Sequence, residues 1–306
     1  MKLIEHEDLS FLSSQIVLGC MRISSMETKQ IQEWFDTALS CGINLFDHAD
    51  IYGGGECENL FAKALSLSPA QRETILIQSK CGICEGYFDF SKEHILNSVD
   101  GILKRLQTDY LDVLLLHRPD TLMEPEEVAE AFDELFEQGK VRSFGVSNQN
   151  PMQIELLKQY VEQPLWCNQL QFSLAHSVMV DSGLTVNMQW DQGINREGSI
   201  LEYSRLNDMT IQAWSPFQKG YFEGVFLGDQ KDYARLNEVI SEMEKKYSLT
   251  PEGIAISWIT SHPAQMQVVL GTTNNERIKN SCTGANVKLE RKDWYALYKA
   301  TGKRLP

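Results

Sequence analysis

Eight short apolar runs, rich in β-branched residues and separated by helical patterns, constrain the fold of this chain more than any other feature. The runs lie at residues 16–19, 43–49, 74–80, 110–117, 141–148, 167–173, 209–216 and 267–271. Strands this uniformly apolar have no face for water, which is typical of a parallel sheet covered by helices. Eight repeats of strand and helix predict an α/β fold, an eight-stranded parallel (β/α)8 TIM barrel. A doubly wound open sheet is the alternative.

Two segments between the runs show clear helical periodicity. The segment 27–42 carries apolar side chains on one face, and Gly42 stands where a C-terminal cap is expected. The segment 124–140 has Pro125 and acidic residues in its first turn, and Gly139 closes it. Both segments are therefore predicted to be amphipathic helices that pack against strands.

The open-sheet alternative lacks its usual glycine fingerprint. The first strand-to-helix turn reads "LGCMRIS", without G-x-G-x-x-G, and the only glycine run, 53–55, follows the second strand. No linker composition and no repeat of 20–50 residues divides the chain. We expect one domain over 1–306, with a long irregular insert at 173–199 after the sixth strand.

Composition limits the classes of partner. A formal net charge of −14 argues against binding to nucleic acid or to an anionic membrane. The N-terminus lacks the pattern of a signal peptide, and no apolar run is long enough to cross a bilayer. The seven cysteines are odd in number and scattered, which suits a reducing compartment. We therefore expect a cytoplasmic protein that acts on a small molecule.

Four ionisable side chains stand at the ends of three consecutive predicted strands. Asp47 and Tyr52 follow the second strand, Lys80 ends the third and His117 ends the fourth. Because active sites of such barrels lie at the C-terminal ends of the strands, we expect these side chains to converge.

The chemistry of this set suits proton transfer to an oxygen. An ammonium beside a tyrosine lowers the phenol pKa, and Lys80 is placed to supply it. Asp47 would keep a buried Lys80 charged. His117 would donate a hydrogen bond that orients a carbonyl oxygen toward Tyr52. The set is suited to protonating an oxygen while a hydride reaches the adjacent carbon.

The motifs around these residues resemble those of aldo-keto reductases. They read "FDHADIYGGGECENLFAKAL", "IQSKCG" and "LLLHRPD", and the resemblance runs from "IVLGCMR" to "GTTNNERIKNS". Their wording is similar to a bacterial subgroup of predicted NADP-dependent oxidoreductases. The resemblance implies a barrel that reduces carbonyls with a nicotinamide cofactor through an Asp, Tyr, Lys, His tetrad. It also implies a monomer as the default oligomeric state.

The second half of the chain resembles the cofactor cradle of that family. The resemblance assigns the nicotinamide carboxamide, the stacking ring, the pyrophosphate and the adenosine end to Ser147, Asn148, Gln169, Trp214, Ser215, Pro216, Phe217, Gly220, Gly271, Thr272, Thr273, Asn274, Arg277 and Asn280. Independently of the family, Thr273 or Asn274 can cap a following helix whose N-terminus favours a phosphate. Arg277, one turn later, can bind phosphate oxygens in a bidentate pair.

Three departures from the family pattern affect the expected specificity. Trp214 stands where many members have tyrosine, which preserves stacking. Gly271 stands where many have a lysine for the 2′-phosphate, so Arg277 is the main basic candidate. We expect NADPH as cofactor, with NADH weaker. The chain ends at "TGKRLP" without a long C-terminal loop, so substrate selection is expected to fall on 173–199.

Other functions remain open at this stage. A nicotinamide-binding sensor or regulatory subunit with little turnover would carry the same residues. A metal-dependent hydrolase could use Asp47, His48, Asp50 and His117. However, adjacent strand residues point to opposite sides, and no H-x-H pair ends a strand, so no metal is expected. Cys81 and Cys84 form a C-x-x-C pair without a second pair, which argues against a zinc site at these cysteines.

Overall fold

The barrel predicted from the eight runs is present. The computed structural model describes residues 1–5 and 11–306, and within them eight parallel strands close into a barrel in the order β10-β3-β4-β5-β6-β7-β8-β9. The strands are β3 (Ile16–Gly19), β4 (Leu45–Asp47), β5 (Leu76–Cys81), β6 (Val113–Leu116), β7 (Phe144–Ser147), β8 (Leu165–Gln171), β9 (Thr210–Trp214) and β10 (Met266–Leu270). Closure by pairing of β10 with β3 excludes the open sheet.

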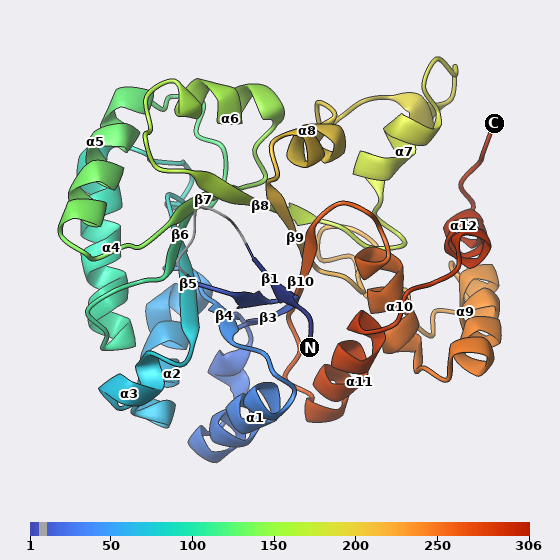
Figure 1. Ribbon diagram of the computed structural model, residues 1–306, viewed down its shortest axis with the longest axis horizontal. Helices are drawn as coiled ribbons and strands as arrows, with labels where there is room; N and C mark the ends of the chain where they lie inside the picture. The colour runs from blue at the N-terminus through green and yellow to red at the C-terminus, as the bar shows by residue number, and fades with distance from the viewer. Residues whose placement is uncertain (6–10) are drawn as a thin grey trace.

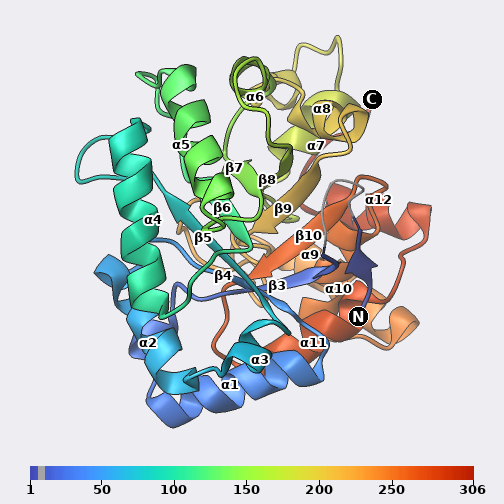
Figure 2. The same ribbon diagram turned by 60° about the vertical axis from the view of Figure 1, so that its left-hand side comes forward.

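Helices surround the strands (Figures 1 and 2). They are α1 (Thr28–Ser40), α2 (Glu56–Leu65), α3 (Pro69–Arg72), α4 (Lys92–Leu106), α5 (Pro125–Glu137), α6 (Pro151–Lys158), α7 (Val178–Leu184), α8 (Ile200–Leu206), α9 (Ala234–Tyr247), α10 (Pro251–Thr260), α11 (Asn275–Ala285) and α12 (Arg291–Ala300). Short 3-10 turns are η1 (Ile23–Ser25), η2 (Tyr52–Gly55) and η3 (Asp191–Gly193). Helices α9 and α12 pack side by side outside α10 (Figure 1).

Local sequence signals define several helix ends. Both helices predicted from periodicity are present as α1 and α5, and Gly42 and Gly139 follow them with positive φ angles of 78° and 68°. Proline occupies the first turn of α5, α6 and α10, where no backbone N–H is needed. The prolines thus mark where helices begin, and the glycines mark where helices end.

The N-terminal segment lies at the bottom of the barrel. The strands β1 (Leu3–Ile4) and β2 (Ser13–Ser14) pair antiparallel just before β3. The ring of Phe11 packs edge-on against Trp166, with centroids 6.1 Å apart, beside an apolar cluster of barrel-strand side chains. Sequence analysis did not predict this antiparallel pair.

A layer of buried glutamines lies inside the barrel. Gln78, Gln169, Gln212 and Gln267 come from four different strands and are almost completely buried. The Nε2 of Gln212 lies 2.9 Å from Oε1 of Gln267, whose own Nε2 lies 2.9 Å from the Ser13 hydroxyl. At its other end the layer reaches Asp47. The barrel interior is therefore polar in the layer that supports the strand ends.

Two long connections leave the C-terminal ends of the strands. The predicted insert, 173–199, is not irregular, since it contains α7 and η3. Its sequence shows no clear apolar periodicity, which explains why the short helix was missed. The second connection, residues 215–233 between β9 and α9, was not anticipated as a long loop.

Candidate active site

A cavity of about 630 Å³ lies at the C-terminal ends of the strands. Its wall includes Asp47 at the end of β4, Tyr52 in η2 and His117 just after β6. Lys80 of β5 is fully buried behind this wall. The structure thus brings together all four residues predicted to form the tetrad, although their catalytic roles stay a prediction.

Lys80 connects the other members of the set. Its Nζ lies 2.8 Å from Oδ2 of Asp47 and 3.1 Å from the hydroxyl oxygen of Tyr52. It also donates to the backbone carbonyl of His48 at 2.7 Å. The second oxygen of Asp47 accepts from Nε2 of Gln78 at 2.6 Å and of Gln169 at 2.9 Å. Every donor of Lys80 therefore has an acceptor, and its ammonium points at Tyr52.

The balance of burial and charge sets the protonation states. Burial lowers the pKa of Lys80, but the Asp47 carboxylate and Tyr52 raise it, and the pKa is raised overall. Lys80 is therefore an ammonium at neutral pH. Burial raises the pKa of Tyr52, and Lys80 lowers it by less. The expectation that Lys80 would lower the Tyr52 pKa below its ordinary value is thus wrong, and Tyr52 holds its proton.

His117 is neutral at neutral pH. Burial, followed by the charges of Lys80 and Arg118, lowers its pKa well below the usual range. Its ring lies nearly perpendicular to that of Tyr52, with centroids 6.0 Å apart. Among the described residues, its Nδ1 has no hydrogen-bond partner. A neutral imidazole beside Tyr52 has one N–H with which to orient a polar ligand atom.

The three consecutive glycines after Tyr52 are explained by backbone conformation. Gly53, Gly54 and Gly55 all have positive φ, at 59°, 64° and 89°. L-residues rarely adopt this region, so the tight turn from β4 into α2 favours glycine at each position. A Cβ on Gly55 would also lie 2.9 Å from Cδ of Arg105. The turn holds Tyr52 over Lys80.

Ten of the fourteen predicted cofactor residues line the same cavity. Ser147, Asn148, Gln169, Trp214, Ser215, Pro216, Phe217, Gly271, Thr272 and Arg277 form its wall. Gly220, Thr273, Asn274 and Asn280 do not. Asn274 instead caps α11, where its Oδ1 accepts from the N–H of Arg277 at 3.0 Å, as predicted.

Hydrogen bonds fix the ring of Trp214. Its Nε1 donates to Oδ1 of Asn148 at 3.3 Å, and Asn148 donates to the Ser147 hydroxyl at 2.8 Å. Asn148 and Ser215 directly follow β7 and β9 and have positive φ angles of 56° and 53°. Strained backbone of this kind persists where the surrounding structure holds it, often at ligand sites. The indole face is thereby presented along the cavity wall.

The far end of the cavity contains two arginines. Arg277 lies beside Glu252, with Nε and Oε1 3.5 Å apart, so its charge is shared with a carboxylate. Arg22 donates from Nη1 to the carbonyl of Gly271 at 3.1 Å. Sequence analysis missed Arg22 and Glu252. "GCMR" follows the first strand, so its position at a strand end was the signal for Arg22.

The loop after β9 supplies much of the cavity wall. Residues from this loop include Gln218, Tyr221, Phe222, Val225, Leu227 and Gly228. No residue of 173–199 lines this cavity in the part of the chain that the structure describes. The insert lines a neighbouring cavity instead, through His176, Val178, Met179, Arg196 and Glu197. Aromatic residues in "KGYFEGVFLG" were the available signal for the β9 loop.

The metal alternative receives no support from the donor arrangement. Among residues 1–5 and 11–306, no group of three or more His, Cys, Asp or Glu side chains is placed to hold a metal ion. His48 is fully buried and packs edge-on against Phe61, with ring centroids 4.7 Å apart. Cys81 is also buried, and burial raises the pKa of its thiol well above the usual value.

Comparisons with known proteins agree with this geometry. The model of the aldo/keto reductase family matches residues 15–301. The chain is 35% identical to an uncharacterized oxidoreductase, YcsN, of Bacillus subtilis, over 96% of this chain and 95% of that protein. It is 33% identical to a 6-dehydroglucose reductase of Agrobacterium fabrum, over 93% of both chains. The crystal structure of a thermostable aldo-keto reductase, 24% identical, superposes with a TM-score of 0.77 over 98% of this chain and 100% of that one.

Proposed function

The chain belongs to the aldo/keto reductase family and is an oxidoreductase that acts on carbonyl or alcohol groups, and we propose that it is an NADPH-dependent reductase of aldehydes or ketones with Tyr52 as proton donor. One observation carries the proposal. The ammonium of Lys80, neutralised by Asp47, lies 3.1 Å from the Tyr52 hydroxyl beside the cavity.

The wall of the cavity fits a nicotinamide cofactor. The side chains of Ser147, Asn148 and Gln169 offer amide and hydroxyl groups for the carboxamide, beside the fixed indole of Trp214. Ser215, Pro216 and Phe217 would contact the pyrophosphate, and Arg277 the adenosine end. When bound there, the reduced cofactor supplies a hydride to the carbonyl carbon. Because Nε2 of Gln169 is already bonded to Asp47, its remaining polar contact is through the amide oxygen.

Tyr52 would protonate the carbonyl oxygen. The neutral imidazole of His117 would donate a hydrogen bond to that oxygen and hold it near the Tyr52 hydroxyl. As the proton leaves Tyr52, the ammonium of Lys80 stabilises the negative charge that develops on the phenol oxygen. Asp47 prevents Lys80 from losing its proton instead. The raised pKa of Tyr52 keeps the acid form populated at neutral pH.

The preference for NADPH over NADH is part of the proposal. A 2′-phosphate near Arg277 would compete with the Glu252 carboxylate for the guanidinium. A phosphate carries more negative charge than a carboxylate and offers three acceptor oxygens, so it should displace Glu252. NADH lacks this group and would leave the Arg277–Glu252 pair in place, which supports weaker use of NADH.

The proposed setting is the cytoplasm, with a small carbonyl compound as substrate and a monomer as the functional unit. The acidic composition supports the absence of nucleic acid partners. No helix within the described residues is both long enough and apolar enough to cross a bilayer.

The test is the decrease of reduced-nicotinamide absorbance with purified protein and a panel of aldehydes and ketones. Sugar aldehydes belong in this panel because a relative is named 6-dehydroglucose reductase. Faster oxidation of NADPH than of NADH supports the proposal. Tight NADPH binding without turnover of any compound would favour the sensor alternative, and absence of binding would contradict both.

A further inference from the structure

A second cavity of about 820 Å³ adjoins the proposed active site. Arg118, Asn148, Trp214 and Tyr221 belong to the walls of both cavities. A substrate whose carbonyl lies at Tyr52 can therefore extend past these four side chains into the second cavity. The side chains that line this cavity then determine which chemical group the distal part of the substrate can carry.

Arg118 stands at the junction with an unneutralised charge. Its guanidinium lies 5.7 Å from the ring centroid of Trp214 and 5.7 Å from that of Tyr221. Within residues 1–5 and 11–306, no carboxylate forms an ion pair with it. By contrast, Arg72 and Arg105 each contact a buried carboxylate at 2.7 Å. A guanidinium keeps its proton in proteins, so Arg118 offers its charge and its donors to a ligand.

A second guanidinium on the same wall also forms no ion pair with a carboxylate of the described residues. Arg196 donates from Nη1 to the backbone carbonyls of Asp191 at 3.1 Å and Ile194 at 3.3 Å, which are neutral acceptors. The carboxylate next to it, Glu197, accepts from the Ser182 hydroxyl at 2.8 Å and from the N–H of Ile200 at 2.7 Å. The cavity therefore contains two cationic groups and one carboxylate that already has donors.

The remaining polar groups on the wall do not change this balance. The Nε2 of Gln171, a donor, and the Oε1 of Gln149, an acceptor, are both buried there without a partner among the described residues. Burial, followed by the charge of Lys303, lowers the pKa of His176, which is therefore neutral at neutral pH. In a chain with a net charge of −14, a cavity whose wall carries two guanidinium groups is an exception to the overall negative charge.

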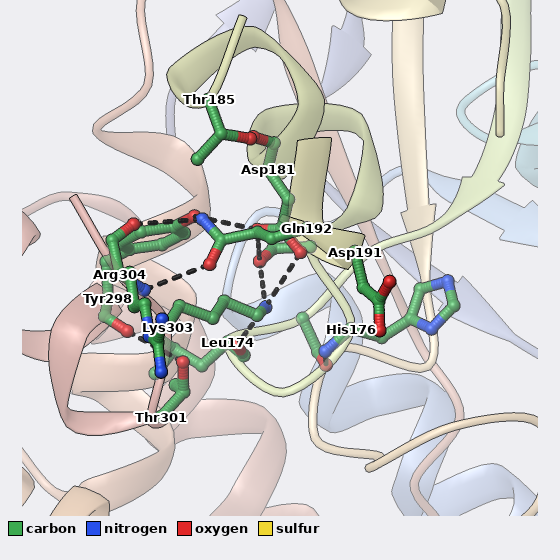
Figure 3. A network of polar contacts seen from close by, with 12 residues as sticks. Leu174, His176, Asp181, Thr185, Asp191, Gln192, Tyr298, Thr301, Lys303 and Arg304 are labelled. Atoms are coloured by element: carbon green, nitrogen blue, oxygen red, sulfur yellow. Dashed lines mark hydrogen bonds and ion pairs between the residues drawn. The ribbon is translucent and has the colours of Figure 1, made fainter. Parts of the chain in front are cut away.

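The C-terminal tail holds one wall of the cavity in place (Figure 3). The ammonium of Lys303 contacts Oδ2 of Asp181 in α7 at 3.4 Å and also the hydroxyl of Ser177. Tyr298 donates to Oδ1 of Asp181 at 3.0 Å. Gln192 accepts from the N–H of Arg304 at 2.9 Å. The wall residues His176, Val178 and Met179 are thus fixed before a ligand binds, which lowers the entropy lost on binding.

We propose that the second cavity binds an acidic group of the substrate, a carboxylate or a phosphate, through Arg118. The proposal rests on the proposed reductase function and adds the substrate class, which is an aldehyde or ketone with an anionic group at its distal end. Carboxylates and phosphates match the planar donor fork of a guanidinium. A neutral substrate would leave the charge of Arg118 without a counter-ion next to two aromatic rings.

The experiment compares aldehydes that differ only in charge. With saturating NADPH, kcat/KM is measured for 4-carboxybenzaldehyde and its methyl ester, in the wild type, Arg118→Gln and a control variant. Arg235→Gln is the control, because Arg235 is exposed on α9 and pairs with Glu238. A charged hydrogen bond contributes about 1.5–3 kcal/mol, so Arg118→Gln should lower kcat/KM for the carboxylate about 10- to 100-fold. The ester and the control variant should change little.

Equal losses for the carboxylate and the ester would overturn the anion subsite while leaving the reductase function intact. If Arg118→Gln lowers kcat/KM more for a phosphate-bearing aldehyde than for the carboxylate, phosphate is the preferred group. If no aldehyde is reduced, the proposed reductase function is contradicted. Calorimetric titration of terephthalate and its dimethyl ester into the NADP-bound protein then decides the subsite separately. Binding of the diacid that Arg118→Gln abolishes supports it, and absence of binding overturns it.

Discussion

The ammonium of Lys80 lies 2.8 Å from the carboxylate of Asp47, and the two side chains are 0% and 2% exposed. Two opposite charges this deeply buried each depend on the other, because removal of one leaves an uncompensated charge away from water. The pair is therefore both a structural element of the barrel and the support of Tyr52.

Substitution Lys80→Met should destabilise the protein by about 3–5 kcal/mol, since it leaves the Asp47 carboxylate buried without its ammonium. Urea unfolding measures this loss. The double variant Asp47→Asn with Lys80→Met should lose less than Lys80→Met alone. Lys140→Met is the matched control, because the pair of Lys140 with Asp100 is partly exposed and should contribute about 0–1 kcal/mol. A cost for Lys80→Met no larger than the control would contradict this reading.

Substitution Tyr52→Phe should abolish most turnover and leave the binding of NADPH intact. The hydroxyl that faces Lys80 is removed while the ring remains beside His117. General acid catalysis contributes about 10²–10⁴-fold, so kcat should fall by that order. Steady-state rates and cofactor fluorescence titration give the two quantities. Full activity in Tyr52→Phe would remove Tyr52 from the mechanism.

Substitution Arg277→Ala should raise the KM for NADPH far more than the KM for NADH. The neighbouring Glu252 provides a test of opposite sign, because Glu252→Gln removes the carboxylate that competes for Arg277. We expect Glu252→Gln to lower the KM for NADPH with little effect on NADH. Arg235→Ala, on the exposed face of α9, serves as control. An equal change for both cofactors in Arg277→Ala would refute the contact with the 2′-phosphate.

Substitution Asp50→Asn should stabilise the protein at alkaline pH. Burial, followed by the charge of Glu58, raises the pKa of Asp50 to about 7. In the unfolded chain an aspartate releases its proton near about pH 3.9, so between these values only the folded state holds it. Stability therefore falls as pH rises through this window. Asp50→Asn should remove that fall.

Unfolding free energies at about pH 4 and about pH 8 test this prediction. The gain of Asp50→Asn over the wild type should be larger at the higher pH. Asp36→Asn, at an exposed position of α1, is the control. If both variants change the pH profile equally, the burial of Asp50 is not the cause.

The strands and the clustering of the four ionisable side chains could be predicted because both leave a linear signal. A buried parallel strand is an uninterrupted apolar run, and Asp47, Lys80 and His117 each stand where such a run ends. The direction of the Tyr52 pKa could not be predicted in the same way. It depends on how far burial outweighs the Lys80 ammonium, and the depth of a side chain below the surface is a property of the folded chain.

The cavity walls were the least predictable part. Loops carry no periodicity, so only the aromatic residues of "KGYFEGVFLG" indicated that the β9 loop, and not 173–199, lines this cavity. The pairing of Arg277 with Glu252 joins the starts of α10 and α11, which are neighbours only in space. The four glutamines were visible in the sequence within apolar runs, but only Gln169 was given a role.

Asp47 sets the orientation of the amide groups in the glutamine layer. An ionised carboxylate only accepts hydrogen bonds, so Asp47 makes the NH2 groups of Gln78 and Gln169 turn toward it. Gln212 accepts from both, donates back to the amide oxygen of Gln78 and donates to Gln267, which donates in turn to Ser13 at the opposite end of the barrel. Reversing one amide would place two oxygens, or two NH2 groups, against each other. The charge of one carboxylate thus dictates the orientation of four glutamine side chains, and an asparagine in its place would permit two orientations of the layer instead of one.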